Sequence, residues 1–252
     1  MEPIIQVNNL TMAHGEHELM RDLTFSVHPG EIFVILGGSG CGKSTLMRHL
    51  IGLQSPTTGE IFIEGSELTT ANATERQNIL KKFGVMYQSG ALFGSMTLLE
   101  NVCVPLEEHT KLPPDAIEAI ARQKLQLVGL GSFAHHLPAE ISGGMQKRAG
   151  IARAMALDPK ILFLDEPSAG LDPITSTELD QLITELARLL GITFVMVSHE
   201  LSSIFSIANR VIMLDKITQS IVAEGDPKQL RAHCDNEWVK QFLNRDLVDE
   251  NH

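Results

Sequence analysis

The residues Gly37, Gly38, Ser39, Gly40, Cys41, Gly42, Lys43, Ser44 and Thr45 form the stretch with the clearest chemistry. An apolar run at 32–36 precedes them and is typical of a buried strand, and residues 46–52 follow as a helix closed by glycine. Glycines let the backbone curl until successive N–H groups face one anion, and the new helix adds its positive end. Lys43 can bridge the outer phosphates of a nucleotide, and the Ser44 hydroxyl can ligate Mg²⁺. The pattern predicts a phosphate loop (residues 37–45), with an ordinary glycine-rich turn as the alternative.

Four other polar residues, Gln88, Asp165, Glu166 and His199, stand at or directly after the ends of predicted strands. In a parallel sheet, ligands bind beyond the carboxyl ends of the strands. We therefore expect these side chains to lie with Lys43 at one edge of the sheet.

Each of these side chains suits one task at a nucleotide. A carboxylate such as Asp165 can hold Mg²⁺, and the neighbouring Glu166 can polarise an attacking water. Gln88 offers an amide oxygen to Mg²⁺ or water, and His199 can donate to a γ-phosphate oxygen. Taken alone, the acidic pair is explained equally well as a solvated strand end, whereas Gln88 and His199 are each better explained singly as hydrogen-bonding strand ends.

A second anion-binding helix start is predicted at Ser142, Gly143 and Gly144. Ser142 suits an N-cap, and the glycines leave backbone N–H groups exposed at the positive end of the helix. The alternative is a simple helix start without a ligand.

Composition limits the function classes. The chain has 252 residues, 43% of them apolar, and a formal net charge of −11. This charge disfavours nucleic acid as a partner. The first residues lack the pattern of a secretion signal and no apolar run approaches the ~20 residues of a membrane helix, so a cytoplasmic protein is expected.

The three cysteines are too far apart for a metal site. Lys43 and the helix start beside Cys41 favour its thiolate, and alkylation there is expected to block nucleotide binding.

Strands alternating with helices predict an α/β protein with a mainly parallel sheet. The opening strands alternate apolar and polar residues, as antiparallel strands do. Residues 89–156 read as an inserted helical part, in which Thr97 and Glu100 fit a capping box. Asp172 and Pro173 begin a long helix that stops at Gly191. We expect one domain over 1–252, with a core of 1–88 and 157–252 and the helical part at 89–156.

The motifs together resemble those of the ATP-binding subunits of ABC transporters. They are the phosphate loop, Gln88, residues 142–145, residues 161–166, residues 168–172 and His199, in that order. The resemblance covers the chain from Ile4 to about Leu230. It implies a RecA-like P-loop NTPase fold with an antiparallel β part and a helical signature subdomain.

The resemblance also implies a mechanism. Two copies would associate head-to-tail around two ATP molecules, each lying between the phosphate loop of one copy and the signature segment (residues 142–145) of the other. Glu166 would be the general base, His199 the γ-phosphate sensor and Asp172 a contact across the dimer. A separate membrane permease would be the partner, with the chain peripheral on the cytoplasmic face of the inner membrane.

Two positions depart from the family pattern. Met145 stands where the family signature has glutamine, so only the contact that the glutamine side chain would make is in doubt. The family often stacks adenine on an aromatic residue after the first strand, and the nearest match here is His14. Imidazole is a smaller stacking surface, so weaker base recognition is expected.

Residues 86–93, 142–148 and 167–173 are similar to those of ATPases of MCE-associated, Mla-type phospholipid transport systems. This resemblance implies lipid trafficking between membranes and an MCE-domain protein as a possible further partner. Force would reach the permease through a groove beside residues 89–96. The alternatives are an ABC ATPase for another substrate, a soluble non-transport ABC ATPase, a nucleotide-sensing module and a kinase.

Overall fold

A computed structural model describes residues 2–15, 17–88 and 90–244, with the side chain of His14 also outside the description. The last residues of the chain, which the sequence predicts to be a frayed acidic tail, lie outside it as well. The strands are β1 (Ile5–His14), β2 (His17–Val27), β3 (Ile32–Gly37), β4 (Thr58–Ile63), β5 (Ser66–Glu67), β6 (Phe83–Met86), β7 (Ile161–Asp165), β8 (Thr193–Val197), β9 (Arg210–Asp215) and β10 (Ser220–Gly225). The α-helices are α1 (Lys43–Leu50), α2 (Ala73–Leu80), α3 (Leu98–His109), α4 (Pro114–Leu127), α5 (Gly143–Ala154), α6 (Pro173–Leu190), α7 (Leu201–Ile207), α8 (Pro227–His233) and α9 (Glu237–Leu243).

Within the described residues the strands form two sheets. The larger has the order β10-β9-β3-β8-β7-β6, and every neighbouring pair in it is parallel except β10 with β9. The smaller has the order β2-β1-β4-β5 and is antiparallel. The predicted α/β class, the mainly parallel sheet and the antiparallel opening strands are confirmed. The edge strand β10 is an addition that the sequence analysis did not predict.

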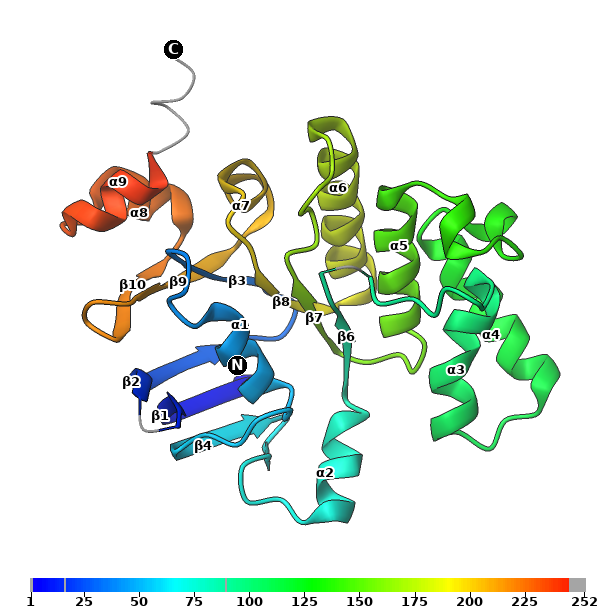
Figure 1. Ribbon diagram of the computed structural model, residues 1–252, viewed down its shortest axis with the longest axis horizontal. Helices are drawn as coiled ribbons and strands as arrows, with labels where there is room; N and C mark the ends of the chain where they lie inside the picture. The colour runs from blue at the N-terminus through cyan, green and yellow to red at the C-terminus, as the bar shows by residue number, and fades with distance from the viewer. Residues whose placement is uncertain (1, 16, 89, 245–252) are drawn as a thin grey trace.

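The larger sheet is covered on both faces (Figure 1). α6 and α7 lie on one face, and α1 with the smaller sheet lies on the other. All residues of β3 and β8 are buried, as expected of strands covered on both sides. These continuous apolar runs are the reason why the strand positions could be read from the sequence.

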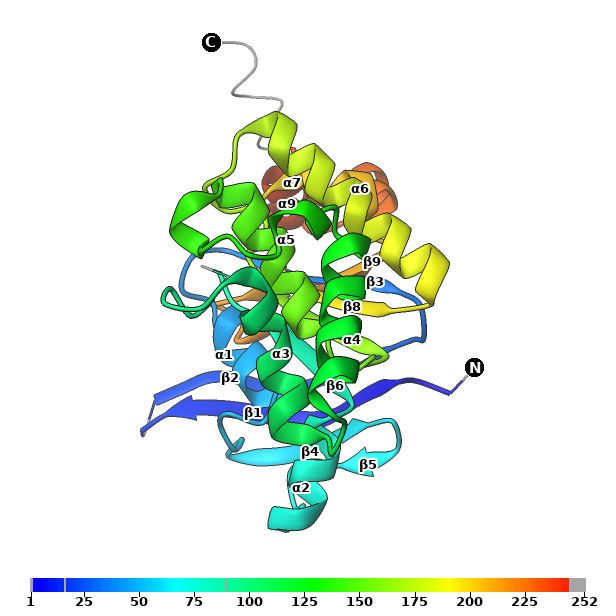
Figure 2. The ribbon, with the colours of Figure 1, turned by 90° about the vertical axis from the view of Figure 1, so that its right-hand side faces the viewer.

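Helices α3, α4 and α5 follow β6 and precede β7 in the chain, and they form a group at one end of the molecule (Figures 1 and 2). Thr97 caps α3 in a capping box with Glu100, as the sequence predicts. Asp172 caps α6, and Gly191 ends it with a φ of 67°. The predicted stop at Gly191 is physically required there, because this left-handed conformation favours glycine.

The helical group contacts the core closely at Gly84. A Cβ atom built on Gly84 in β6 would lie 1.9 Å from the carbonyl oxygen of Ala154, at the end of α5. β6 and α5 therefore touch through their backbones, and no side chain fits between them.

We expect Gly84→Ala to destabilise the protein by at least about 1–3 kcal/mol, because the added methyl group must push α5 away from β6. Urea unfolding of the full chain measures the effect. Gly94→Ala is the matched control, since nothing lies within 4 Å of its Cβ position, and its effect should stay within about 0.5 kcal/mol. Equal stabilities of the two variants would contradict the close backbone contact.

Candidate functional site

The phosphate loop joins β3 to α1 in a conformation that glycine alone adopts readily. Gly37, Gly40 and Gly42 have φ values of 147°, 73° and 96°. A Cβ atom on Gly37 would lie 2.5 Å from both Cys41 Sγ and the Leu214 carbonyl oxygen. A side chain at position 37 would therefore clash with β9 and with the loop itself, so the tight curl depends on glycine.

Lys43 and Ser44 begin α1 at the mouth of this loop. The Lys43 ammonium donates to the carbonyl oxygens of Gly37 at 2.8 Å and of Gly38 at 3.0 Å. The N-cap residue Gly42 has no side chain with which to accept the first N–H groups of α1. The helix start is therefore available to an anion, with a positive charge held beside it.

Asp165 ends β7 with a buried oxygen, Oδ1, that has no hydrogen-bond partner among the described residues. Burial raises the pKa of the Asp165 carboxyl, and the charge of Glu166 raises it further. An unpaired buried carboxylate oxygen is costly unless a cation satisfies it. Asp165 and the Ser44 hydroxyl are both oxygen ligands of the kind Mg²⁺ prefers, so the residues present fit this ion.

Glu166 is held in a strained backbone conformation, with a φ of 49°. Its N–H donates to the Val197 carbonyl oxygen at 2.9 Å, which ties it to the end of β8. His199 Nδ1 lies 2.8 Å from Glu166 Oε2, but the angles of a hydrogen bond are not met and Oε2 is otherwise unpaired within the described chain. The Glu166 side chain is 14% exposed and that of His199 is 55% exposed. Left-handed non-glycine residues cost roughly 1–3 kcal/mol and cluster at functional sites.

Gln88 lies just beyond β6 with an exposed side chain. Its carbonyl oxygen accepts a hydrogen bond from Lys147 Nζ, which also donates to the Glu166 carbonyl oxygen at 3.3 Å. Burial lowers the pKa of Lys147, and the charge of Glu166 opposes that shift. Lys147 thus joins the ends of β6 and β7 from α5.

The sequence analysis assigned no role to Lys147. One signal was available, because Lys147 lies three residues after Gly144 and four before Ile151, on the buried face of a helical pattern. A charged residue on an apolar helix face needs a buried partner.

The signature segment begins α5, with Ser142 as the N-cap accepting from the Met145 N–H at 3.3 Å. Ser142 and Gly143 are exposed, whereas a Cβ atom on Gly144 would lie 2.3 Å from Thr175 Cγ2 of α6. The predicted cap is confirmed. In Figure 1, α1 and α5 lie apart with β7 and β8 between them, so one chain does not bring its two anion-binding helix starts together.

Asp172 acts within its own chain as the cap of α6. Its carboxylate accepts from the N–H groups of Ile174 and Thr175, both at 3.1 Å. The Thr175 hydroxyl also donates to it at 2.5 Å. These hydrogen bonds, above all that of the Thr175 side chain, lower the pKa of Asp172.

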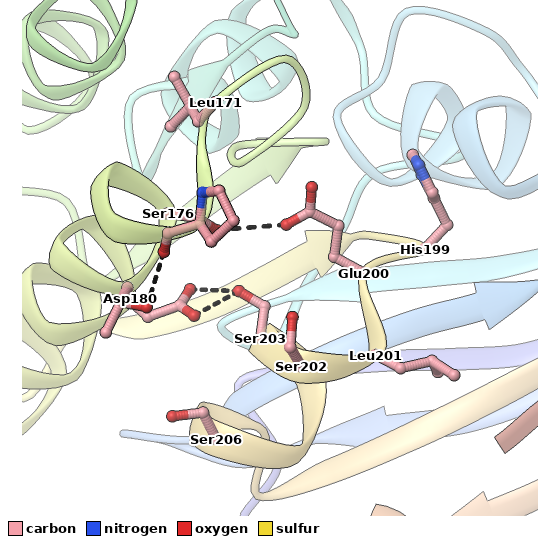
Figure 3. Close-up of a pocket in the computed structure, with 11 residues that line it drawn as sticks. Leu171, Ser176, Asp180, His199, Glu200, Leu201, Ser202, Ser203 and Ser206 are labelled. Atoms are coloured by element: carbon pink, nitrogen blue, oxygen red, sulfur yellow. Dashed lines mark hydrogen bonds between the residues drawn. The ribbon is translucent and has the colours of Figure 1, made fainter. Parts of the chain in front are cut away.

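A cleft of about 510 Å³ lies between α6 and α7, beside His199 (Figure 3). Ser203 donates to the buried Asp180 carboxylate, and Ser176 donates to Glu200 Oε2 at 3.2 Å. These polar groups satisfy one another, and their hydrogen bonds fasten the turn that carries His199 to α6.

Of the predicted site residues, the structure brings Lys43, Gln88, Asp165, Glu166 and His199 to the carboxyl ends of β3, β6, β7 and β8. The stacking surface predicted at His14 and the groove residue Ser89 lie outside the described residues.

The expectation for Cys41 is wrong in its premise. Cys41 is 2% exposed, and burial raises the pKa of its thiol even though Lys43 Nζ lies 4.0 Å from Sγ. The thiolate is therefore disfavoured.

Comparison with known proteins agrees with this geometry. The family model described as ABC transporter matches residues 20–169. The probable ribonucleotide transport ATP-binding protein mkl of Mycobacterium tuberculosis is 42% identical over 240 residues, which cover 95% of this chain and 66% of that protein. The chain thus spans slightly less than two thirds of the mycobacterial relative. The intermembrane phospholipid transport system ATP-binding protein MlaF of Escherichia coli is 39% identical over 241 residues, covering 95% of this chain and 88% of that protein.

Solved structures share the fold. The dimeric post-hydrolysis state of the ATP-binding cassette MJ0796, bound to ADP and Pi, matches with a TM-score of 0.78 and 30% identity over 88% of this chain and 98% of that chain. CbiO1 from Clostridium perfringens, part of the ABC transporter complex cbiONQ, matches with a TM-score of 0.85 and 26% identity over 100% of this chain and 98% of that chain.

We expect Cys41 to react slowly with iodoacetamide in the folded protein, because only the thiolate is nucleophilic and burial raises the thiol pKa. At about pH 8 its alkylation should be at least about tenfold slower than in the urea-unfolded chain, and should accelerate as the pH rises. Mass spectrometry of the Cys41 peptide measures both rates. Equal rates in the folded and unfolded protein would mean that the thiol is accessible and ionised.

Proposed function

Because the chain belongs to the ABC transporter family, we propose that it hydrolyses ATP to drive a separate membrane permease that moves phospholipid between membranes. The observation that carries the chemistry is the pair Asp165 and Glu166. Within the described chain, Asp165 presents a buried oxygen without a hydrogen-bond partner, and the next residue, Glu166, is held in a strained backbone conformation and tied to the end of β8. Both features are explained if the pair receives a cation and a reacting nucleotide.

ATP phosphates would bind the N–H groups of the phosphate loop, and the Lys43 ammonium would move from the carbonyl oxygens of Gly37 and Gly38 to the outer phosphates. Ser44, Gln88 and Asp165 would hold Mg²⁺, which supplies charge neutralisation when bound. Glu166 would accept a proton from the attacking water, and His199 would hold the γ-phosphate. The approach of His199 to within 2.8 Å of Glu166 supports a shared task.

A head-to-tail dimer would complete the site. The signature segment is an exposed, serine-capped helix start that lies apart from the phosphate loop of its own chain (Figure 1). Beside it, Ile174 next to the cap Asp172 is 75% exposed and would be covered by the other copy. One ATP would then lie between the phosphate loop of one copy and the signature segment of the other, and hydrolysis would release the two copies.

The name of the Escherichia coli relative includes intermembrane phospholipid transport, and this relative is covered over 88% of its length. We therefore favour lipid as the cargo, a location on the cytoplasmic face of the inner membrane and an MCE-domain protein as a further partner. Among the described helices none is long and apolar enough to span a bilayer. The mycobacterial relative's name instead includes ribonucleotide transport, which is the alternative cargo. Co-purification with membrane proteins rather than ribosomes separates transport from a soluble role.

The permease would dock in a cleft of about 440 Å³ between α3 and α4, which Figure 2 shows side by side. Met96, Leu99 and Ile117 give the cleft an apolar floor, and Glu107 and Glu118 stand at its rim. The acidic rim favours a basic, amphipathic segment of the permease. The first residue that lines the cleft, Ser95, lies seven residues after Gln88 in the chain, so a nucleotide at Gln88 could move the bound segment through this short connection.

We expect Glu166→Gln to bind ATP but hydrolyse it about 10²-fold or more slowly, since it removes the base while keeping the shape. Size-exclusion chromatography should then show an ATP-dependent dimer, and phosphate release gives the rate. Lys43→Ala is the comparison, since it should lose ATP affinity instead. Near-normal turnover in Glu166→Gln would remove Glu166 as the base, and normal affinity in Lys43→Ala would contradict the placement of the phosphates.

We expect Glu107→Lys to weaken co-purification of the permease by about tenfold, because it reverses charge at the rim of the α3–α4 cleft. The ATPase rate of the isolated chain should stay unchanged. Glu108→Lys is the matched control, because this neighbouring exposed residue does not line the cleft. Quantitative pull-down from membranes compares the two variants, and an equal loss in both would place the docking surface elsewhere.

A further inference from the structure

Lys147 is a buried cation, and its side-chain hydrogen bonds to the described residues go to the candidate site. Its side chain is 6% exposed, and its ammonium donates to the carbonyl oxygens of Gln88 and Glu166. These are backbone groups of the two residues expected to meet the nucleotide and the attacking water. A buried ammonium costs several kcal/mol unless it is paired, so these contacts are strongly held.

The same helix also fastens the turn after Gln88. Arg153, near the end of α5, donates to the carbonyl oxygens of Ala91 at 2.7 Å and Gly90 at 3.1 Å. A Cβ atom on Gly150 would lie 3.2 Å from the Gly90 Cα. α5 is therefore fastened to Gln88, Gly90 and Ala91 by hydrogen bonds and a close backbone contact.

Gly143 is the exposed first residue of α5, and Lys147 lies one helical turn further along the same helix. A displacement of this helix start by an anion would also move Lys147, because Gly143 and Lys147 lie one turn apart in the same helix. The helix start would face the nucleotide of the partner, while the carbonyl groups bound by Lys147 belong to the nucleotide site of its own chain.

We propose that Lys147 is a positioning residue that couples the two ATP sites of the dimer. When a nucleotide engages the signature segment, α5 shifts, and Lys147 moves the backbone of Glu166 and Gln88 in the other site. Each site then hydrolyses ATP efficiently once its twin is also filled. This inference rests on the proposed head-to-tail dimer and goes beyond it, because it assigns the communication between the two sites to one residue, Lys147.

The test compares two buried lysines of the helical group. Lys147→Met removes both hydrogen bonds and keeps the length of the side chain. Lys124→Met is the matched control, because Lys124 on α4 is 5% exposed and pairs with Asp158, away from the candidate site. The measurements on the full chain are ATP affinity, the maximal hydrolysis rate and the Hill coefficient for ATP.

For two coupled sites, the Hill coefficient of the natural chain should lie between 1 and about 2. In Lys147→Met it should fall to about 1, with the maximal rate reduced about tenfold or more and the affinity changed less than about threefold. Lys124→Met should lose stability but keep its cooperativity. Lys147→Arg, which restores the donors, should recover cooperativity, and Lys147→Gln serves as the second variant if Lys147→Met does not fold.

The outcomes separate the two proposals. A cooperative natural chain and an equally cooperative Lys147 variant would overturn the coupling role alone. The same loss of cooperativity in Lys124→Met would reduce Lys147 to a structural residue. A natural chain that hydrolyses ATP without cooperativity and without dimerising overturns both the coupling and the proposed dimer.

Discussion

Parallel pairing of β3, β8, β7 and β6 is the constraint on which the candidate site depends. The register aligns Ile35 with Val197 and Asp165 with Val197, so these strands end at nearly the same level. Residues far apart in the chain are placed together because each one follows a strand of this set. The strands β3 and β8 are buried on both faces, so the packing of their side chains against the layers on each side holds this register.

At this edge the protein holds groups that are unfavourable in isolation. Among the described residues, Asp165 Oδ1 is buried without a hydrogen-bond partner, and Glu166 adopts a left-handed backbone conformation. The fully buried β3 and β8 provide the packing that tolerates this strain. Each unfavourable group corresponds to something a nucleotide with its cation would supply, so binding would relieve costs that folding has already incurred.

Local signals in the sequence predicted much of this arrangement. The phosphate loop, the capping box at Thr97 and the stop at Gly191 depend on residues within a few positions of one another, and a single sequence shows such patterns directly. The burial of Cys41 and the contacts of Lys147 depend on segments that are distant in the chain. The sequence gives the charge of Lys43 beside Cys41, but it does not show how completely the folded core excludes water from the thiol. This non-local information explains why the thiol prediction was wrong and why Lys147 was missed.

The position of the helical group between β6 and β7 has a mechanical consequence. The group leaves the core just after Gln88 and returns before β7, whose end carries Asp165. At the start it is fastened by the Lys147 and Arg153 hydrogen bonds, and at its return by the backbone contact of Gly84 with Ala154. Helices α3, α4 and α5 pack against one another, so the signature segment and the α3–α4 cleft belong to the same packed group. Under the proposed mechanism, a shift of this group at the phosphates would therefore also displace the cleft, which lies outside the nucleotide site.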